Sequence, residues 1–286
     1  MLLAPARAGR PNDIGKGSPS GCPFCPGNES ATPPETQAVR PGGGRADGPG
    51  WTVRAIPNKF PTVPADEGSH EVVINSPRHL ASLSELTPDE AAAAVGVWAD
   101  RLRAVGDDPR GLTPYLFLNQ GALAGASLTH THAQIVGLPM VPGRLATRDR
   151  AFAQRAGLLL DDIATDRIVV REAGLVAWCP EVPSMSGVIR VAPERPAPDW
   201  RSGLDAAGFG ATLVRLVEAV ESGLGAENVN ICLFERPPGG TPSYHWHLDL
   251  IPRLGTLAGL ELGAGVIAAH RAPQDVAAEL RPAFAA

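Results

Sequence analysis

The 286-residue sequence contains the same succession of five segments twice. Each succession has two apolar segments typical of strands, an amphipathic helix, a third strand, and a His-Xaa-His motif that leads into a fourth strand. The first set comprises residues 51–57, 71–75, 91–105, 114–119 and 130–138, and the second comprises 175–180, 187–195, 210–220, 229–235 and 245–250. Five matched segments in one order indicate an internal duplication.

The duplication predicts two domains, residues 1–145 and 146–286, joined through a polar, arginine-rich stretch at 141–167. Residues 1–50 are rich in Gly, Pro and Asn, so we expect them to form surface loops. The first long helix has a clear start, because Thr87 and Glu90 form a capping box around Pro88. Strands that alternate with helices of about 15–20 residues favour an α+β fold, with sheets covered by helices.

Composition excludes several classes of protein. Hydrophobic residues make up 44% of the chain, which is enough to build a core and argues against a disordered chain. The net charge of −5 is opposite to that of a general nucleic-acid binder. No apolar run approaches the roughly 18 residues that a membrane span needs. The first ten residues do not have the pattern of a signal peptide, so we expect a cytoplasmic protein with no membrane partner.

The densest chemical signal lies between Asn119 and Gln134, where a glycine-containing loop leads into His-Thr-His-Ala-Gln. In an extended chain alternate residues share a face, so His130, His132 and Gln134 are expected to project together. An imidazole can attack phosphorus, and a neighbouring amide can hold a phosphoryl oxygen. The structural alternative is a pair of histidines that only form hydrogen bonds on a sheet.

The motif Cys22-Pro-Phe-Cys25 is the second signal. Two thiolates at this spacing can bind one zinc ion, which then needs two more nitrogen or sulfur ligands. The spacing alone does not choose among the seven histidines. A pair of buried thiols and a redox pair are the alternatives.

These motifs resemble those of the galactose-1-phosphate uridylyltransferase family, within the histidine-triad superfamily. The resemblance rests on PARAGRP (5–11), CPFCPGNESATPPE (22–35), RAIPNKFP (54–61), INSPRHLASLSEL (74–86) and the block 119–134. The second half is matched by the order of its elements and by HWHLDLIPR (245–253). The resemblance implies two tandem histidine-triad-like halves, each an antiparallel sheet covered by helices.

The resemblance also implies roles for single residues. His132 would be the nucleophile, and Gln134 would hold the phosphoryl oxygens of a nucleotidyl-histidine. One structural zinc ion would be bound by four ligands, namely Cys22, Cys25, His79 and His130. The nucleotide and its phosphates would be lined by Asn58, Asn119, Gly125 and Ser127. Arg7 and Arg10 would meet phosphate charge, although solvated surface arginines are equally compatible with the sequence.

The activity implied is that of a UDP-glucose–hexose-1-phosphate uridylyltransferase, acting by double displacement. Its partners would be a nucleoside diphosphate sugar, a sugar 1-phosphate and a second copy of the chain in a homodimer. The alternatives are an ADP-sugar adenylyltransferase or phosphorylase using the same histidine, a dinucleoside polyphosphate hydrolase, and a nucleotide-binding protein without catalysis. Histidine-triad hydrolases have a third histidine where this chain has Gln134, and a glutamine does not transfer protons at neutral pH, which favours transfer over hydrolysis.

Several positions depart from the family pattern. Thr131 stands where the family usually has proline. Plant relatives that act on adenine sugars carry a second Cys-Xaa-Xaa-Cys in the second half, where this chain has only Cys179 and Cys232, so we expect no second cysteine zinc site. Some bacterial members have an iron site that ends in His-Xaa-His, but His247 and Asp249 align there, so the pattern for a second metal is incomplete. The hexose-gripping Tyr-Glu pair is not visible at 258–266. We expect His245 and His247 to be structural remnants or to contribute to substrate binding, and His70 and His270 to be surface residues.

Overall fold

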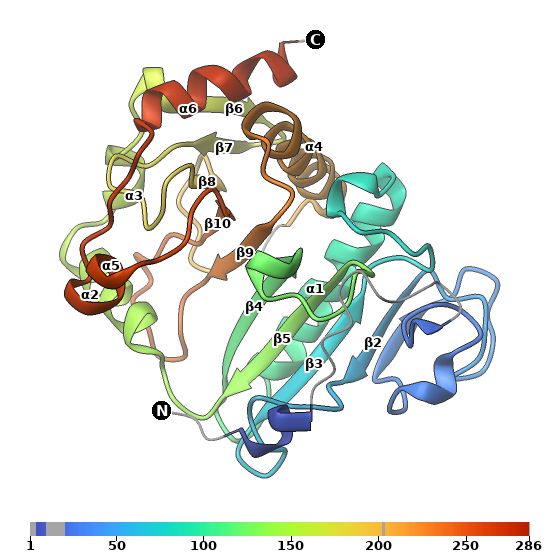
Figure 1. The fold of residues 1–286 in the computed structure, drawn as a ribbon. Helices are drawn as coiled ribbons and strands as arrows, with labels where there is room; N and C mark the ends of the chain where they lie inside the picture. The colour runs from blue at the N-terminus through green and yellow to red at the C-terminus, as the bar shows by residue number, and fades with distance from the viewer. Residues whose placement is uncertain (1–3, 10–20, 202–203, 286) are drawn as a thin grey trace.

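The computed structural model describes residues 4–9, 21–201 and 204–285, so Arg10 lies outside the described residues. Ten strands form one sheet, in the order β1-β2-β3-β5-β4-β9-β10-β8-β7-β6 (Figure 1). The strands are β1 (Gln37–Val39), β2 (Val53–Pro57), β3 (Ser69–Ile74), β4 (Thr113–Gln120), β5 (His132–Leu138), β6 (Ile168–Glu172), β7 (Leu175–Trp178), β8 (Ile189–Pro193), β9 (Val229–Phe234) and β10 (His247–Pro252). Every neighbouring pair is antiparallel.

The α-helices are α1 (Pro88–Gly106), α2 (Gly143–Gln154), α3 (Leu158–Asp161), α4 (Ala206–Leu224), α5 (Gly259–Ala264) and α6 (Pro273–Leu280). Short 3-10 helices are η1 (Pro5–Gly9), η3 (Glu29–Ala31), η4 (Leu83–Glu85), η5 (Ala122–Ala124), η6 (Thr165–Arg167) and η7 (Arg281–Phe284). The predicted capping box starts α1, since the Thr87 side chain accepts from the Glu90 amide and Glu90 accepts from the Thr87 amide. Within the described part of the chain, no helix is both long and apolar enough to cross a bilayer.

The strand order of the second half mirrors that of the first, with β4 and β9 meeting at the centre. The α+β fold expected from the sequence is therefore confirmed, with one difference. The two expected sheets are continuous, because β4 pairs with β9 from Phe117↔Cys232 to Gln120↔Val229. Division into domains 1–145 and 146–286 stays a proposal, which the mirrored order supports. Residues 37–39 also form a strand within the stretch expected to be loop.

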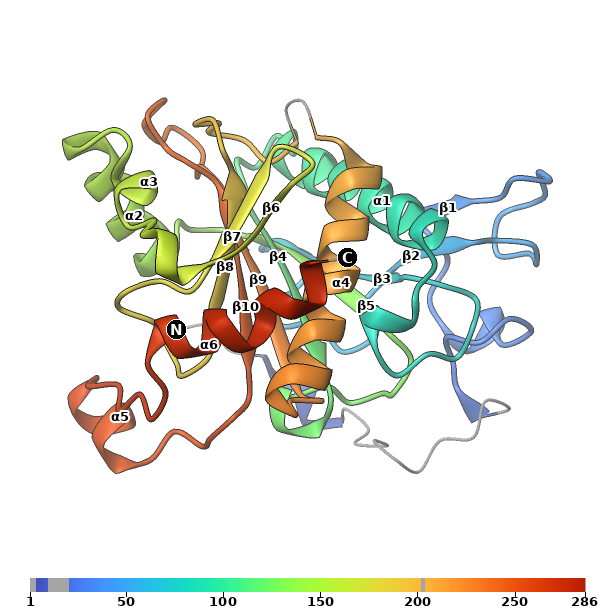
Figure 2. The same ribbon diagram turned by 90° about the horizontal axis from the view of Figure 1, so that it is seen from above.

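The two faces of the sheet differ in what covers them. On one face, α1 and α4 pack side by side over a hydrophobic core that extends through both halves (Figures 1 and 2). The opposite face carries two separate apolar clusters, one around Phe24 and Ile74 and one around Phe152 and Trp178. Because side chains alternate along a strand, Ala133 and Ile135 of β5 join the helix-covered core. His132 and Gln134 consequently lie on the other face.

Candidate active site

The strand register brings His132 and Gln134 to one cavity of about 130 Å³ in the first half, called here the N-terminal cavity. On β5, His132 pairs with Ile74 and Gln134 pairs with Val72 of the neighbouring β3. The cavity is lined by His132 and Gln134 together with Phe24, Ile56, Asn58, Val72, Ser127 and Leu128, among others. Both His132 and Gln134 are buried. Most of the lining residues are apolar and a few are polar, as in many small-molecule sites.

A backbone hydrogen bond fixes the tautomer of His132. Its Nδ1 lies 2.7 Å from the carbonyl oxygen of His130. A carbonyl can only accept, so Nδ1 carries the proton and donates it. In the neutral imidazole, Nε2 then keeps its lone pair. This is the state that a nucleophilic histidine needs.

His130 does not project into this cavity with His132, in contrast to the expectation from simple alternation. The strand β5 begins only at His132, and the Thr131 amide donates instead to the carbonyl oxygen of Leu80 at 2.8 Å. The His130 ring turns toward the cysteine pair, with its Nδ1 3.6 Å from the Sγ atoms of both Cys22 and Cys25. Its Nε2 donates to the carbonyl oxygen of Ser76 at 2.8 Å.

The ligand atoms of Cys22, Cys25, His79 and His130 lie within 4.8 Å of one another, and this set is called here the Cys–His cluster. His79 Nδ1 is 3.3 Å from Cys25 Sγ. Ligands around a tetrahedral zinc ion are about 3.3–3.8 Å apart, given the usual Zn–S and Zn–N bond lengths. The cluster is thus a possible metal-binding site, with the spacing and donor types that suit zinc.

The electrostatics of the Cys–His cluster agree with a role as cation ligands. Burial lowers the pKa of His130 to about 4, so its imidazole is neutral and Nδ1 can offer a lone pair. Burial and the neighbouring Cys22 raise the pKa of Cys25 to about 11. A thiolate there requires a compensating positive charge, which a bound metal ion supplies.

Phe24, between the two cysteines, connects the Cys–His cluster to the N-terminal cavity. Its ring centroid lies 5.2 Å from that of His132, in an edge arrangement, and the side chain lines the cavity. The sequence pattern of Cys-Xaa-Xaa-Cys did not single out this residue. What could have pointed to Phe24 is its position in the sequence. A side chain between the two cysteines of one Cys-Xaa-Xaa-Cys motif must lie close to any ion that both cysteines bind.

The sequence prediction for His70 is wrong, because this residue is 5% exposed rather than on the surface. Its Nε2 lies 3.1 Å from Gln134 Oε1 and 3.1 Å from Asn58 Nδ2. Its Nδ1 accepts from the backbone amide of Thr62 at 2.9 Å. The sequence places His70 on the same strand face as Val72, but only the register with β5 brings it to Gln134. His270 is exposed, as predicted.

Only some of the other predicted binding residues line the N-terminal cavity. Asn58 and Ser127 line it. Asn119 accepts a hydrogen bond from Asn230 of β9 at 2.9 Å, and Gly125 has a left-handed backbone next to it. Neither Asn119 nor Gly125 is among the described residues lining this cavity. Arg7 donates to Thr62 Oγ1 at 2.8 Å, which places it close to the backbone amide that contacts His70.

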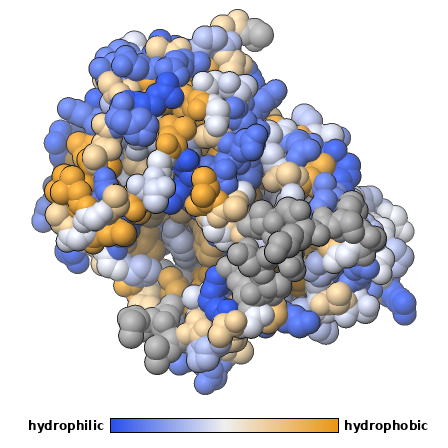
Figure 3. Space-filling model, in the orientation of Figure 1, coloured by the Kyte–Doolittle hydropathy of each residue, from blue (hydrophilic) through white to orange (hydrophobic). Residues whose placement is uncertain are grey.

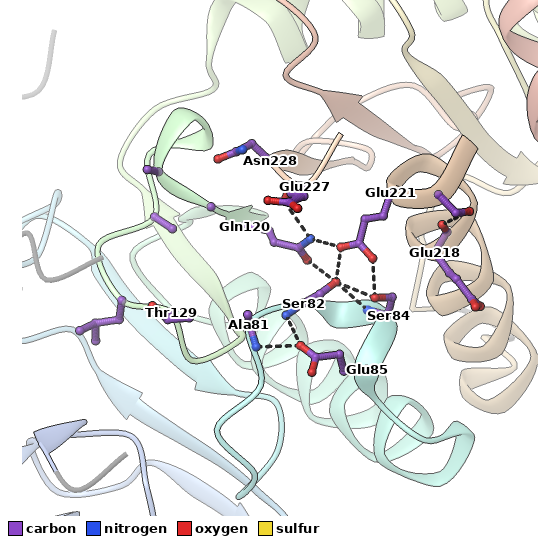
Figure 4. Close-up of a pocket in the computed structure, with 15 residues that line it drawn as sticks. Ala81, Ser82, Ser84, Glu85, Gln120, Thr129, Glu218, Glu221, Glu227 and Asn228 are labelled. Atoms are coloured by element: carbon purple, nitrogen blue, oxygen red, sulfur yellow. Dashed lines mark hydrogen bonds between the residues drawn. The ribbon is translucent and has the colours of Figure 1, made fainter. Parts of the chain in front are cut away.

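A larger cavity, of about 750 Å³, lies behind the glycine-containing loop and does not include His132 (Figure 4). At its centre Glu221 of α4 accepts hydrogen bonds from Ser82, Ser84 and Gln120, at 2.5, 2.6 and 2.7 Å. Gln120 ends β4 and precedes Gly121, whose φ of 78° and closeness to Asn228 exclude a side chain. This network therefore anchors the start of the loop from the second half of the molecule.

The second half contains an altered version of the same arrangement. His247 Nδ1 lies 3.1 Å from the carbonyl oxygen of His245, as His132 does with His130. Here, however, an Arg148 Nη1 donates to His247 Nε2, and Asp249, in the place of Gln134, forms two hydrogen bonds with Arg190. His247 lines a cavity of about 290 Å³ with both arginines. At His247, the Nε2 lone pair is thus engaged by an arginine.

A doubled sheet with one His-Xaa-His-Xaa-Gln cavity and a neighbouring Cys–His cluster defines a tandem histidine-triad-like protein. A family model for the N-terminal domain of galactose-1-phosphate uridyl transferase matches residues 52–142. This match and the relatives below confirm the resemblance to the galactose-1-phosphate uridylyltransferase family found in the sequence.

Comparisons with individual proteins extend this likeness over the whole chain. An ADP-glucose phosphorylase of Arabidopsis thaliana is 26% identical, over 98% of this chain and 89% of its own. The crystal structure of an ADP-glucose phosphorylase from Arabidopsis thaliana with bound ADP-glucose superposes with a TM-score of 0.81 at 27% identity, over 97% and 93% of the two chains. A galactose-1-phosphate uridylyltransferase of Streptomyces lividans is 28% identical over 65% of this chain, which spans 51% of that enzyme.

Proposed function

We propose that the protein is a nucleotidyltransferase that acts on nucleoside diphosphate sugars through a covalent nucleotidyl-His132. The observation that carries the proposal is the hydrogen bond from His132 Nδ1 to the His130 carbonyl, which puts the proton of the neutral ring on Nδ1 and the lone pair on Nε2, on a residue that lines the N-terminal cavity. The relatives are transferases and a phosphorylase, which supports an enzyme of this class.

The proposed reaction has two displacements. In the first, His132 Nε2 attacks the α-phosphorus, and the bond from this phosphorus to the bridging oxygen breaks. The sugar 1-phosphate leaves with that electron pair. In the second, a phosphate oxygen of the acceptor attacks the same phosphorus, and Nε2 recovers its lone pair. Asn58, Ser127 and the amide of Gln134 line the cavity and are proposed to bind the phosphoryl oxygens.

The Cys–His cluster is proposed to hold one structural zinc ion, since its four donors and their spacing fit that metal. Zinc would supply a fixed anchor for the His130 ring. The His130 carbonyl in turn holds Nδ1 of His132. The cluster thereby orients the nucleophile without touching substrate, as outer groups commonly do at metal sites.

For the substrates, we propose UDP-glucose as donor and a hexose 1-phosphate as acceptor, the pair that the family name implies. A second candidate, ADP-glucose with inorganic phosphate as acceptor, is favoured by one observation. The Arabidopsis relative named for that activity aligns with 98% of this chain.

Intact-protein mass spectrometry after brief incubation with each donor, without acceptor, tests these proposals. We expect a uridylyl or adenylyl mass gain that disappears in His132→Gln. The matched control is His247→Gln, which changes the second histidine of the other His-Xaa-His and should still form the adduct. An adduct that persists in His132→Gln would contradict the assignment of the nucleophile. Adding galactose 1-phosphate or inorganic phosphate to the adduct then identifies the acceptor.

We also propose that the protein forms a homodimer. Four large apolar side chains are exposed in and after α5, namely Leu260, Leu262, Val266 and Ile267, and they are called here the α5 patch. Figure 3 shows hydrophobic residues gathered on the face where α5 and α2 lie. Contiguous apolar surface of this kind commonly marks a protein–protein contact.

A further inference from the structure

We infer that His70 is a positioning residue that fixes which end of the Gln134 amide faces the substrate. The inference rests on the proposed transfer through His132. A glutamine amide has an oxygen that accepts and a nitrogen that donates, so its orientation decides whether it attracts or repels a phosphoryl oxygen. Gln134 lines the N-terminal cavity from the same strand face as His132.

The tautomer of His70 follows from a backbone group that cannot reorient. The amide of Thr62 donates to His70 Nδ1 at 2.9 Å, so this nitrogen must be the acceptor. A neutral imidazole then carries its proton on Nε2. The Nε2–H lies 3.1 Å from Gln134 Oε1 and donates to it. A cationic or Nδ1-protonated ring would place two hydrogens against each other at Thr62.

The consequence for Gln134 is a fixed amide. With Oε1 held by His70, the N–H groups at the other end of the planar amide are available to the phosphoryl group. Asn58 Nδ2 lies 3.1 Å from the same His70 Nε2, but Asn58 Oδ1 accepts from the Phe60 amide at 2.8 Å, so Nδ2 is itself a donor and cannot accept the Nε2 proton. Gln134 Oε1 is therefore the acceptor for Nε2–H, and the Gln134 amide supplies the oriented donor to the N-terminal cavity. Donors that are oriented before the reaction stabilise developing charge without the cost of reorganisation.

Substitutions at position 70 separate this role from simple packing. In His70→Leu the donor is lost, and we expect the single-turnover rate of adduct formation to fall about tenfold, as for one lost oriented hydrogen bond. His70→Gln can accept from Thr62 and donate to Gln134, so it should recover most of the rate. The glutamate of His70→Glu is of the same size as the glutamine of His70→Gln, but both of its carboxylate oxygens accept hydrogen bonds. We therefore expect His70→Glu to invert the Gln134 amide and to keep adduct formation slow.

A double-mutant cycle with Gln134→Ala provides the decisive measurement. If His70 acts through Gln134, His70→Leu should have little further effect on the rate once Gln134 is absent. The same tenfold loss in both backgrounds would overturn the inference, as would equal rates for His70→Gln and His70→Glu. Thermal unfolding of each variant identifies any that fail to fold. If His70→Leu is one of them, the comparison of His70→Gln with His70→Glu is the test. Failure of the wild-type protein to form an adduct with either donor would instead contradict the proposed function.

Discussion

Thr131, between the two site histidines, forms hydrogen bonds through its backbone and its side chain. Its amide donates to the Leu80 carbonyl at 2.8 Å, and its Oγ1 accepts from Asn75 Nδ2 at 3.2 Å. The fully buried Asn75 in turn accepts from Trp98 of α1 at 3.0 Å. The residue where the family usually has proline is therefore connected to the helix on the other face of the sheet.

Replacing Thr131 by proline should consequently destabilise this chain. Proline has no amide proton and no hydroxyl, so both buried bonds are lost, at a cost of about 1–3 kcal/mol in the free energy of unfolding. Thr131→Val keeps the amide and should lose only about half as much. Denaturant unfolding measures both variants, and a proline variant as stable as the parent would show that the amide bond is unimportant.

Only some of the individual residues of the candidate site could be predicted from the sequence. Local spacing identified His132, Gln134 and the two cysteines, because each motif lies within a few residues. His70 and Phe24 were missed, since their roles depend on the β3–β5 register and on where the cysteine loop rests. Which partner lies opposite a strand residue is decided by tertiary pairing, and no local pattern contains it.

Among the elements, those with strong local signals were predicted well. The capping box gave α1, and short apolar runs gave strands that form β2, β3, β4 and β7. The stretch 141–167 contains α2 and α3, which its polar composition did not reveal. The sequence led us to expect two sheets, but the pairing of β4 with β9 joins them into one. This pairing connects segments more than 100 residues apart, so no local pattern indicates it.

The loop that carries Cys22 and Cys25 packs in the apolar cluster around Phe24 and Ile74, and the proposed zinc ion would hold it further. We expect purified protein to contain one zinc ion per chain. Cys25→Ser should lose this zinc and reduce adduct formation, because His130 is no longer anchored. Cys232→Ser changes a cysteine outside the Cys–His cluster and serves as the matched control. Metal analysis and the adduct rate measure both effects, and full zinc content in Cys25→Ser would contradict the ligand set.

For the whole molecule, the exposed α5 patch leads to a test of assembly. Leu262 is 73% exposed, so Leu262→Glu should be harmless within one chain but should oppose burial against a second copy. We expect the parent to sediment as a dimer and this variant as a monomer. Val182→Glu, at a residue that is 86% exposed outside the α5 patch, should leave the dimer intact. A parent that sediments as a monomer at all concentrations would refute the homodimer.

His247 of the second half, whose Nε2 is engaged by Arg148, shows what joining two copies in one chain permits. When one gene encodes two identical subunits, every substitution appears at both sites, so neither can give up its chemistry alone. Joining the copies in one chain removes that constraint. Arg148 and the Asp249–Arg190 pair could then accumulate around His247 while selection on His132 stayed intact. On this view the second half was released to evolve as a scaffold, and its strand β9 still completes the sheet that supports the first.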